Sequence, residues 1–290
     1  MEIINRRRRM MSVARRLRRE ENRTIGLVPT MGALHEGHLS LIHEARALCD
    51  VVVASVFVNP TQFGPNEDFA SYPRDLTRDS ALLAEYNVDY VFAPTSEEIY
   101  PAGFSTYVTV DGLSDRLEGA ARPGHFRGVS TVVAILLNIV RPNFAFFGQK
   151  DAQQSIVIRQ LVRDLAFEAE VVVLPIVREE SGLAMSSRNA YLDEQQRRAA
   201  TVLNRALSQA RTAYDEGEQN ASRIVDLVRS TIEKEPLARI DYVSLNDAET
   251  LAKLDKVDDR PALLSLAVFF GNTRLIDNVV LGSQKRAVTA

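Results

Sequence analysis

The sequence contains one cysteine and no run of apolar residues long enough to cross a membrane. A single cysteine cannot form an internal disulfide, which fits a reducing compartment, and we expect Cys49 to be buried packing rather than a nucleophile. The longest apolar run, near residues 129–140, contains Asn138 and ends at Arg141. The arginine-rich residues 6–19 lack the following apolar core of a secretory signal. We therefore expect a cytoplasmic protein.

The chain also has no excess of positive charge. Its 35 lysines and arginines are outnumbered by 38 aspartates and glutamates, for a net charge of −3. This argues against nucleic acid as a main partner, because a duplex binder usually has a basic surface. The first residues nevertheless predict a surface amphipathic helix with solvated arginines, on an apolar stripe of Ile4, Met10, Met11, Val13, Ala14 and Leu17. An RNA-binding arm or a transit peptide is the alternative reading of this segment.

Several catalytic arrangements are missing as well. The histidines, cysteine and carboxylates show no metal-site spacing, since residues 35–38 read HEGH and not HExxH. There is no Walker A motif, no Ser-His-Asp arrangement, no internal repeat and no low-complexity segment. These absences exclude a protein-bound zinc site, a P-loop nucleotidase and a triad hydrolase.

What the sequence does contain is an alternation of strands and helices. We expect strands at 25–28, 51–58, 88–92, 144–147 and 170–174, a possible short strand at 107–110, and a loop over 119–128. The intervening helices are expected at 38–49, 76–86, 129–140 and from Asp151, as N-cap, to about 165. Strands separated by helices predict an α/β fold, a Rossmann-like parallel sheet with helices on both faces.

At 290 residues the chain is long enough for two domains. The pattern changes after Pro175, so we expect a first domain at 1–176 and a smaller C-terminal α+β domain at 177–290. The second domain is expected to hold a helix from the N-cap Asp193 to about 214 and another over 221–234. Extended runs follow at 240–245, 263–270 and 275–280, and Gly271-Asn272 separates the last two like a hairpin turn.

The first strand leads into TMGALHEGH, which holds two of the four histidines. We expect Pro29 to end the strand, because proline cannot donate to a sheet ladder. His35 and His38 then lie on a strand-to-helix turn at a helix N-terminus, whose N–H groups attract phosphate. Isolated histidines at helix starts are usually structural, but the pairing favours a phosphate-binding turn. This HxGH resembles the signature of the nucleotidylyltransferase and class I aminoacyl-tRNA synthetase superfamily.

Two further segments carry positive charge beside small or hydroxyl residues. In GQKDAQQ, Gly148 permits close approach and Lys150 offers a point charge to phosphate. In AMSSRN, two serines adjoin Arg188, a combination that can hold a triphosphate. The second segment resembles the KMSKS-type loop of the same superfamily. Each segment alone is weak evidence for a phosphate site, because a solvated lysine or a surface Ser-Ser-Arg sequence is common.

Other segments offer neutral or mixed polar groups. Asn59 and Gln62 in NPTQF carry amides that suit hydroxyls and carboxylates, although Asn-Pro by itself is ordinary turn chemistry. Arg122 and His125 in RPGHF can hold a carboxylate or lie in a solvated loop, and Tyr72 in YPRD is equally open.

Taken together, PTMGALHEGH, SVFVNPTQFG, YPRD, AARPGHFRGV, FGQKDAQQ, VREESGLAMSSRN and the closing TRLIDN resemble the pantoate–β-alanine ligase family, from about Ile3 to Leu281. Gln149 departs from the glutamate usual there. The resemblance implies ATP-dependent formation of pantoyl adenylate, attack by β-alanine, and a homodimer. It also implies that Mg²⁺ assists adenylate formation. The residues themselves favour Mg²⁺ held chiefly by ATP phosphates and water and not by the protein alone, with Asp79 and Asp151 as the nearest candidate carboxylates.

The resemblance implies residue roles by matching motif positions. The ATP site would comprise Met31, Gly32, Ala33, Leu34, His35, Glu36, Gly37, His38, Gly148, Gln149, Lys150, Asp151, Val177, Met185, Ser186, Ser187 and Arg188. Catalytic roles would fall to His35, His38, Lys150, Ser186, Ser187 and Arg188. Gln62 and Gln154 would orient pantoate, with Gln62 also near β-alanine. Further substrate contacts would come from Pro29, Met31, Asn59, Phe63, Tyr72, Arg122 and His125.

Two rival functions remain open at this point. One is a nucleotidyltransferase that leaves the nucleotide on its product. The other is a non-catalytic nucleotide-binding regulator on the same fold, which would bind ATP without releasing pyrophosphate.

Overall fold

The computed structural model describes residues 1–65 and 67–282 and divides them into two compact units, Met1–Ile176 and Val177 onward. Residues 283–290 of the expected second domain lie outside the described residues. Among the described helices, none has the length and apolar character needed to span a membrane.

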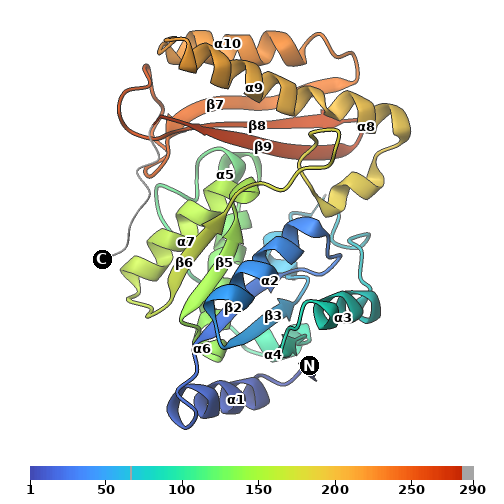
Figure 1. Cartoon of the computed structure of the whole chain (residues 1–290), viewed down its shortest axis with the longest axis vertical. Coiled ribbons are helices and arrows are strands. Elements are labelled where there is room, and N and C mark those ends of the chain that lie inside the picture. The colour runs from blue at the N-terminus through green and yellow to red at the C-terminus, as the bar shows by residue number, and fades with distance from the viewer. Residues whose placement is uncertain (66, 283–290) are drawn as a thin grey trace. The chain divides into compact units, whose positions relative to one another are not determined.

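The first unit contains a six-stranded parallel sheet in the order β1-β4-β3-β2-β5-β6. Four of its strands, β3, β2, β5 and β6, are labelled in Figure 1. The expected parallel α/β fold is confirmed. Its strands are β1 (Glu2–Ile4), β2 (Ile25–Thr30), β3 (Val51–Val56), β4 (Tyr90–Phe92), β5 (Phe144–Gly148) and β6 (Glu170–Leu174). Its helices are α1 (Arg7–Arg19), α2 (Glu36–Leu48), α3 (Leu76–Glu85), α4 (Ser96–Ile99), α5 (Glu118–Ala121), α6 (His125–Val140) and α7 (Ala152–Asp164).

Helices cover both faces of this sheet. The connections from β2 to β3 and from β3 to β4 run one way along the sheet, and the others run the opposite way. Right-handed crossovers therefore place α2 and α3 on one face and α1, α6 and α7 on the other. The packing agrees, because α6 contacts both α1 and α7, and Leu41 and Leu83 from α2 and α3 share one buried cluster with Val28 of β2.

The direction in which successive strands are added reverses between β2 and β5, which are neighbours inside the sheet. The next strand after β2 lies on one side, and the next strand after β5 lies on the other. Such a reversal opens a crevice beyond the carboxyl ends of the two strands, where α/β proteins bind ligands. The segments that follow β2 and β5 are TMGALHEGH and QKDAQQ.

Four expectations for this unit were wrong. Pro29 does not end β2, which continues to Thr30. The strand β5 pairs with β2 only at Gly26 and Leu27, so no residue of β5 requires a hydrogen bond from the backbone nitrogen of Pro29. The arginine-rich helix is present, with Met10, Val13, Ala14 and Leu17 buried, but Ile4 belongs to the separate strand β1. Residues 107–110 form no strand.

The fourth concerns the segment 119–128, which is not a loop. It holds α5 and the first turn of α6, which begins at His125 after Gly124, a residue with φ +84°. Gly128 lies in that first turn, and the position requires glycine because a Cβ there would collide with the backbone carbonyl of Thr61. The polar residues that looked like a loop therefore pack α6 against the 3-10 turn η1 (Pro60–Gln62).

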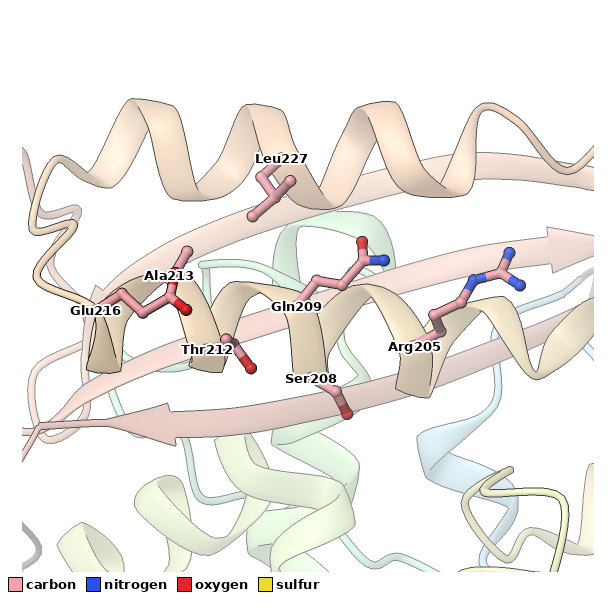
Figure 2. Close-up of a pocket in the computed structure, with 7 residues that line it drawn as sticks. All are labelled: Arg205, Ser208, Gln209, Thr212, Ala213, Glu216 and Leu227. Atoms are coloured by element: carbon pink, nitrogen blue, oxygen red, sulfur yellow. The ribbon is translucent and has the colours of Figure 1, made fainter.

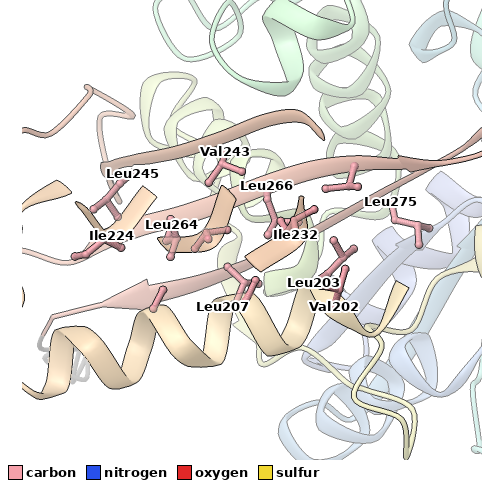
Figure 3. Packing of buried hydrophobic residues seen from close by; sticks show 14 of the residues in the cluster. Val202, Leu203, Leu207, Ile224, Ile232, Val243, Leu245, Leu264, Leu266 and Leu275 are labelled. Carbon is pink, nitrogen blue, oxygen red and sulfur yellow. The ribbon is translucent and has the colours of Figure 1, made fainter. Parts of the chain in front are cut away.

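The second unit contains an antiparallel sheet of β7 (Ala238–Asp247), β8 (Ala262–Phe270) and β9 (Thr273–Leu281). Its helices are α8 (Glu194–Ala200), α9 (Val202–Asp215) and α10 (Ala221–Ile232). Figure 3 shows side chains of α9 and α10, such as Leu207 and Ile224, packing on sheet residues such as Leu264 and Leu266. The expected α+β architecture and the Gly271-Asn272 hairpin turn are confirmed.

The helix expected from Asp193 to about residue 214 is interrupted. Asp193 does cap α8, with its side chain accepting the Gln196 N–H at 2.8 Å. At Thr201, however, both the N–H and the hydroxyl donate to the carbonyl of Arg198. This tighter turn separates α8 from α9.

Candidate functional site

The HxGH turn joins the central strand β2 to α2, as the sequence predicted. Gly32 and Ala33 both adopt positive φ, +82° and +51°, which turns the backbone sharply after the strand. His35 is the N-cap residue of α2, so the helix begins at Glu36 and not at His38. The two imidazole rings lie 4.1 Å apart between centroids, inclined by 37°.

The local hydrogen bonds determine which nitrogen of each ring carries the proton. Nδ1 of His35 accepts the Gly37 N–H at 3.2 Å, and Nδ1 of His38 accepts the His35 N–H at 3.4 Å. An imidazole nitrogen that accepts cannot also carry a proton, so each neutral ring has its hydrogen on Nε2. The capping of α2 thus leaves both rings as Nε2–H donors.

Both rings are neutral at physiological pH. Burial, then the positive charge of Lys150, and to a lesser extent that of Arg78, together lower the pKa of His35 to about 4, against an opposing effect of Asp151. Burial, then the His35 ring, lower the pKa of His38 to about 3, again against Asp151. The fixed positive charge of this site therefore comes from Lys150 and Arg78, while the histidines contribute hydrogen-bond donors.

The segment after β5 reaches the same place. Gly148 ends β5, and Gln149–Asp151 forms the 3-10 turn η2 before α7. Lys150 and Asp151 act on the pKa values of both histidines, so their charges lie beside the HxGH turn. Lys150 Nζ lies 3.5 Å from Asp151 Oδ1. Asp151 occupies the N-cap position of α7, but contrary to expectation its side chain makes no capping hydrogen bond.

The two carboxylates suggested as metal supports differ in their surroundings. Asp79 is 1 % exposed, and its Oδ2 and Oδ1 accept the N–H groups of Ala33 and Leu34, each at 2.9 Å. Both oxygens are therefore engaged by the turn itself, and Asp79 is a poor metal ligand. Within residues 1–65 and 67–282, no three histidine, cysteine or carboxylate side chains gather as a metal site.

The NPTQF segment forms η1 at the end of β3, which pairs with β2. Asn59 is 1 % exposed and saturated: its Oδ1 accepts Thr61 Oγ1 at 2.9 Å and the Tyr100 hydroxyl at 2.7 Å. Its Nδ2 donates to Gln62 Oε1 at 3.0 Å and to the carbonyl of Gly128 at 3.2 Å. Asn59 therefore aims the amide of Gln62, whose Nε2 lies 3.1 Å from the sulfur of Met31 in the HxGH segment.

Arg122 and His125 also meet Gln62. Arg122 forms two 2.6 Å bonds to the carboxylate of Glu67, so its charge is paired within the protein. His125 Nδ1 donates to the Gln62 carbonyl at 2.8 Å, and its Nε2 accepts from Arg122 at 3.2 Å. Burial and then Arg122 lower the pKa of His125 to about 4. These side chains brace the Gln62 backbone, and no motif in the sequence pointed to the Glu67 partner.

Neighbouring glutamines on α7 have different surroundings. Gln153 is 4 % exposed and fully engaged, accepting the Glu118 N–H at 2.9 Å and donating to the carbonyls of Leu113 and Arg116. Gln154 is partly exposed in the first turn of the helix. Tyr72 is buried, with its ring edge-on to Phe63 at 5.8 Å.

In the second unit, the Ser-Ser-Arg segment follows a short hairpin. Arg178 and Ala184 form an antiparallel bridge, and Met185 N–H donates to the Val177 carbonyl at 3.0 Å. The Ser186 hydroxyl then accepts the Arg188 N–H at 3.2 Å and caps the 3-10 turn η3 (Ser187–Tyr191). The expected irregular loop therefore has a defined local structure.

Side chains that sequence reasoning missed anchor this hairpin to its own unit. Arg178 bonds both oxygens of Asp277 on β9, at 2.7 and 3.0 Å. Glu179 accepts from Asn189 Nδ2 at 2.8 Å and from Arg197 at 2.7 Å. The only sequence signals were the charges in VREES and TRLIDN, which name no partners.

A separate surface groove of about 440 Å³ lies along α9 and α10 (Figure 2). It is lined by Arg205, Ser208, Gln209, Thr212, Ala213, Glu216 and Leu227. None of the candidate site residues lines it.

A parallel sheet whose strand β2 runs into an HxGH turn, with a lysine from the turn after the adjacent strand β5 beside it, defines an α/β protein whose site resembles that of nucleotidylyltransferases. Comparison with known proteins narrows this class. The sequence pattern of pantoate-β-alanine ligase matches residues 2–280. The chain therefore belongs to the pantoate–β-alanine ligase family.

Individual relatives agree. The pantothenate synthetase of Herpetosiphon aurantiacus is 60 % identical over 257 residues, which cover 89 % of this chain and 93 % of that protein. The crystal structure of pantothenate synthetase from Thermus thermophilus has a TM-score of 0.90 at 46 % identity, covering 96 % of this chain and 99 % of that one. The Francisella tularensis ligase, complexed with β-γ ATP and β-alanine, has a TM-score of 0.79 at 36 % identity, with 97 % of each chain covered.

Proposed function

We propose that this chain condenses (R)-pantoate with β-alanine in a reaction driven by ATP, forming pantothenate, AMP and pyrophosphate. A pantoate carboxylate oxygen attacks the α-phosphorus, and the bond to pyrophosphate breaks. The amine of β-alanine then attacks the acyl carbon of pantoyl adenylate, loses a proton, and AMP leaves. Family membership supports the overall reaction, as does the ATP and β-alanine complex of the Francisella relative.

The observation that carries this proposal is the pair of neutral imidazoles beside Lys150 at the switch point of the sheet. Two Nε2–H donors and an ammonium can stabilise charge on a pentavalent phosphorus without a proton transfer. We assign His35, His38 and Lys150 to that role. The turn from Met31 to His38 would cradle the triphosphate, together with Gly148, Gln149 and Asp151.

Gln62 and Gln154 would orient pantoate against Pro29, Met31 and Phe63, with Gln62 also near β-alanine. Asn59, Arg122 and His125 would act through Gln62, because their polar atoms already bond it or its neighbours. Tyr72 would support the wall beside Phe63.

The second unit would supply the remaining ATP contacts from Val177, Met185, Ser186, Ser187 and Arg188. We propose that it acts as a lid, which would protect the reactive adenylate from water.

Mg²⁺ fits this site only as a companion of ATP. Asp79 is engaged with backbone N–H groups, whereas the Asp151 carboxylate beside Lys150 is partly exposed. Bound with the phosphates, Mg²⁺ would offset their negative charge. We also propose a homodimer, which the family resemblance implies and which sedimentation can test. A cytoplasmic setting is proposed because it fits a chain with a single cysteine.

Product analysis tests the proposed function. Incubation with ATP, pantoate and β-alanine should yield equal amounts of pantothenate and AMP. A product that keeps the nucleotide would support the nucleotidyltransferase instead. ATP binding without pyrophosphate release would support the regulator.

A further inference from the structure

The HxGH turn is held by a helix that no motif assigns to the site. Ala33 has a left-handed φ of +51°, an unfavourable conformation for a residue with a Cβ. The turn has no β-ladder at Ala33 and Leu34, because β2 has ended and α2 has not begun. Their N–H groups donate instead to Asp79 on α3, 46 and 45 residues further along the chain.

This contact is close and buried. Asp79 is 1 % exposed, and each of its oxygens accepts one N–H at 2.9 Å. A carboxylate that accepts backbone N–H groups makes charge-assisted hydrogen bonds, which are stronger than neutral ones. The preceding residue, Arg78, donates to the Leu34 carbonyl at 3.3 Å, so α3 holds the turn with a donor as well as an acceptor.

The glycine of the motif fits the same contact. A Cβ on Gly32 would lie 2.8 Å from Asp79 Oδ2 and 3.2 Å from Val56 Cγ1. Any side chain at Gly32 would therefore push Asp79 away from the turn. The glycine allows the carboxylate to approach the backbone that it fixes.

We propose that Asp79 is a positioning residue for adenylate formation. Its carboxylate holds Ala33 and Leu34 in the strained turn, and thereby directs the two Nε2–H groups of His35 and His38 toward the phosphates. Asp79 touches no substrate in this account and binds no metal. The proposal rests on the proposed function, in that its kinetic test measures adenylation.

The first test compares Asp79→Asn with a matched control on the same helix. The amide keeps the shape of the side chain but sets an NH₂ against one of the two backbone donors. We expect kcat for pantoate-dependent pyrophosphate exchange to fall by about tenfold to a hundredfold, with the KM for pantoate changed by less than about twofold. Asp75→Ala removes the exposed N-cap of α3, where Asp75 accepts the Arg78 N–H at 2.9 Å, and should lower Tm by about 2–4 °C with normal kcat per folded molecule. Wild-type kcat in folded Asp79→Asn would overturn the proposal.

A second variant separates positioning from general damage. Glycine adopts positive φ at no steric cost, so Ala33→Gly in the Asp79→Asn background should restore kcat several-fold. If kcat does not recover, Asp79 does not act through the conformation of this turn, and the proposal fails.

A third measurement needs no variant and no activity. Because both N–H groups donate to a buried carboxylate, the amides of Ala33 and Leu34 should exchange with solvent as slowly as those of the core of α2. Fast exchange at both positions would overturn the proposal even if the enzyme is active. Slow amide exchange in a protein that does not catalyse pyrophosphate exchange would instead support the contact between Asp79 and the turn and reject the proposed function.

Discussion

Acidification from pH 7.5 to 5.5 should destabilise this protein more than an ordinary α/β protein. Burial lowers the pKa of His35, His38 and His125 to about 4, 3 and 4, against 6.5 in an unfolded chain. Between those values the unfolded chain binds protons that the folded chain does not. The contribution of these histidines to stability is therefore constant above about pH 7 and is lost as the pH falls from 6.5 toward 4.

The size of the loss follows from the pKa values. At pH 5.5 a histidine of the unfolded chain, with a pKa of 6.5, is about ten times more often protonated than neutral. This preference corresponds to a loss of about 1.4 kcal/mol in folding free energy per histidine. The three partly buried rings together give at most about 4 kcal/mol, a large share of a typical folding free energy. Carboxyl groups with lowered pKa values, such as Glu67, change the folding stability only below about pH 4.5, which is outside the pH range of this test.

Urea unfolding at pH 7.5, 6.5 and 5.5 measures this effect. His125→Gln should remove about a third of the pH dependence. His43→Gln, on the exposed surface of α2, is the matched control for loss of a histidine side chain. Equal unfolding free energies at pH 7.5 and 5.5 would refute the assignment of neutral, buried imidazoles, and so would an imidazole of the HxGH turn that titrates near 6.5 by NMR.

Three further predictions concern single side chains. Lys150→Ala and His38→Ala should each lower the adenylation rate at least about a hundredfold with the fold intact, and normal pyrophosphate exchange would remove the residue from the mechanism. Asp277→Ala should cost about 3 kcal/mol in urea unfolding, because Arg178 loses its two bonds to the buried carboxylate and keeps only its bond to the Gly182 carbonyl; a loss below about 1 kcal/mol would contradict this. Burial raises the pKa of Cys49 to about 11, so a thiol reagent at pH 8 should label it only after unfolding, and rapid labelling of the native protein would be inconsistent.

The order of strands and helices could be predicted because apolar runs alternate with amphipathic segments. Short or polar elements could not: β1 has three residues, and the first turn of α6 reads as a loop until Gly128 is seen to pack on η1. The HxGH turn was predictable from two histidines in four residues. The tautomers of its two histidine rings were not predictable, because they depend on which backbone N–H group donates to each ring.

Buried polar partners were the least predictable feature of the site. Asn59 and Gln62 look equivalent in NPTQF, yet Asn59 is saturated by hydrogen bonds and aims Gln62. Adjacent Gln153 and Gln154 differ in the same way. Asp79 seemed available to a metal because its partners, Ala33 and Leu34, lie far away along the chain. Spacing shows which residue types are present, but not which are already satisfied.

The most direct test of the central claim is exchange of labelled pyrophosphate into ATP with pantoate present and β-alanine absent. If the HxGH turn and Lys150 activate the pantoate carboxylate as an adenylate, label should enter ATP, and only when pantoate is added. Pantothenate synthesis from all three substrates, with no exchange before β-alanine is supplied, would contradict the adenylate route.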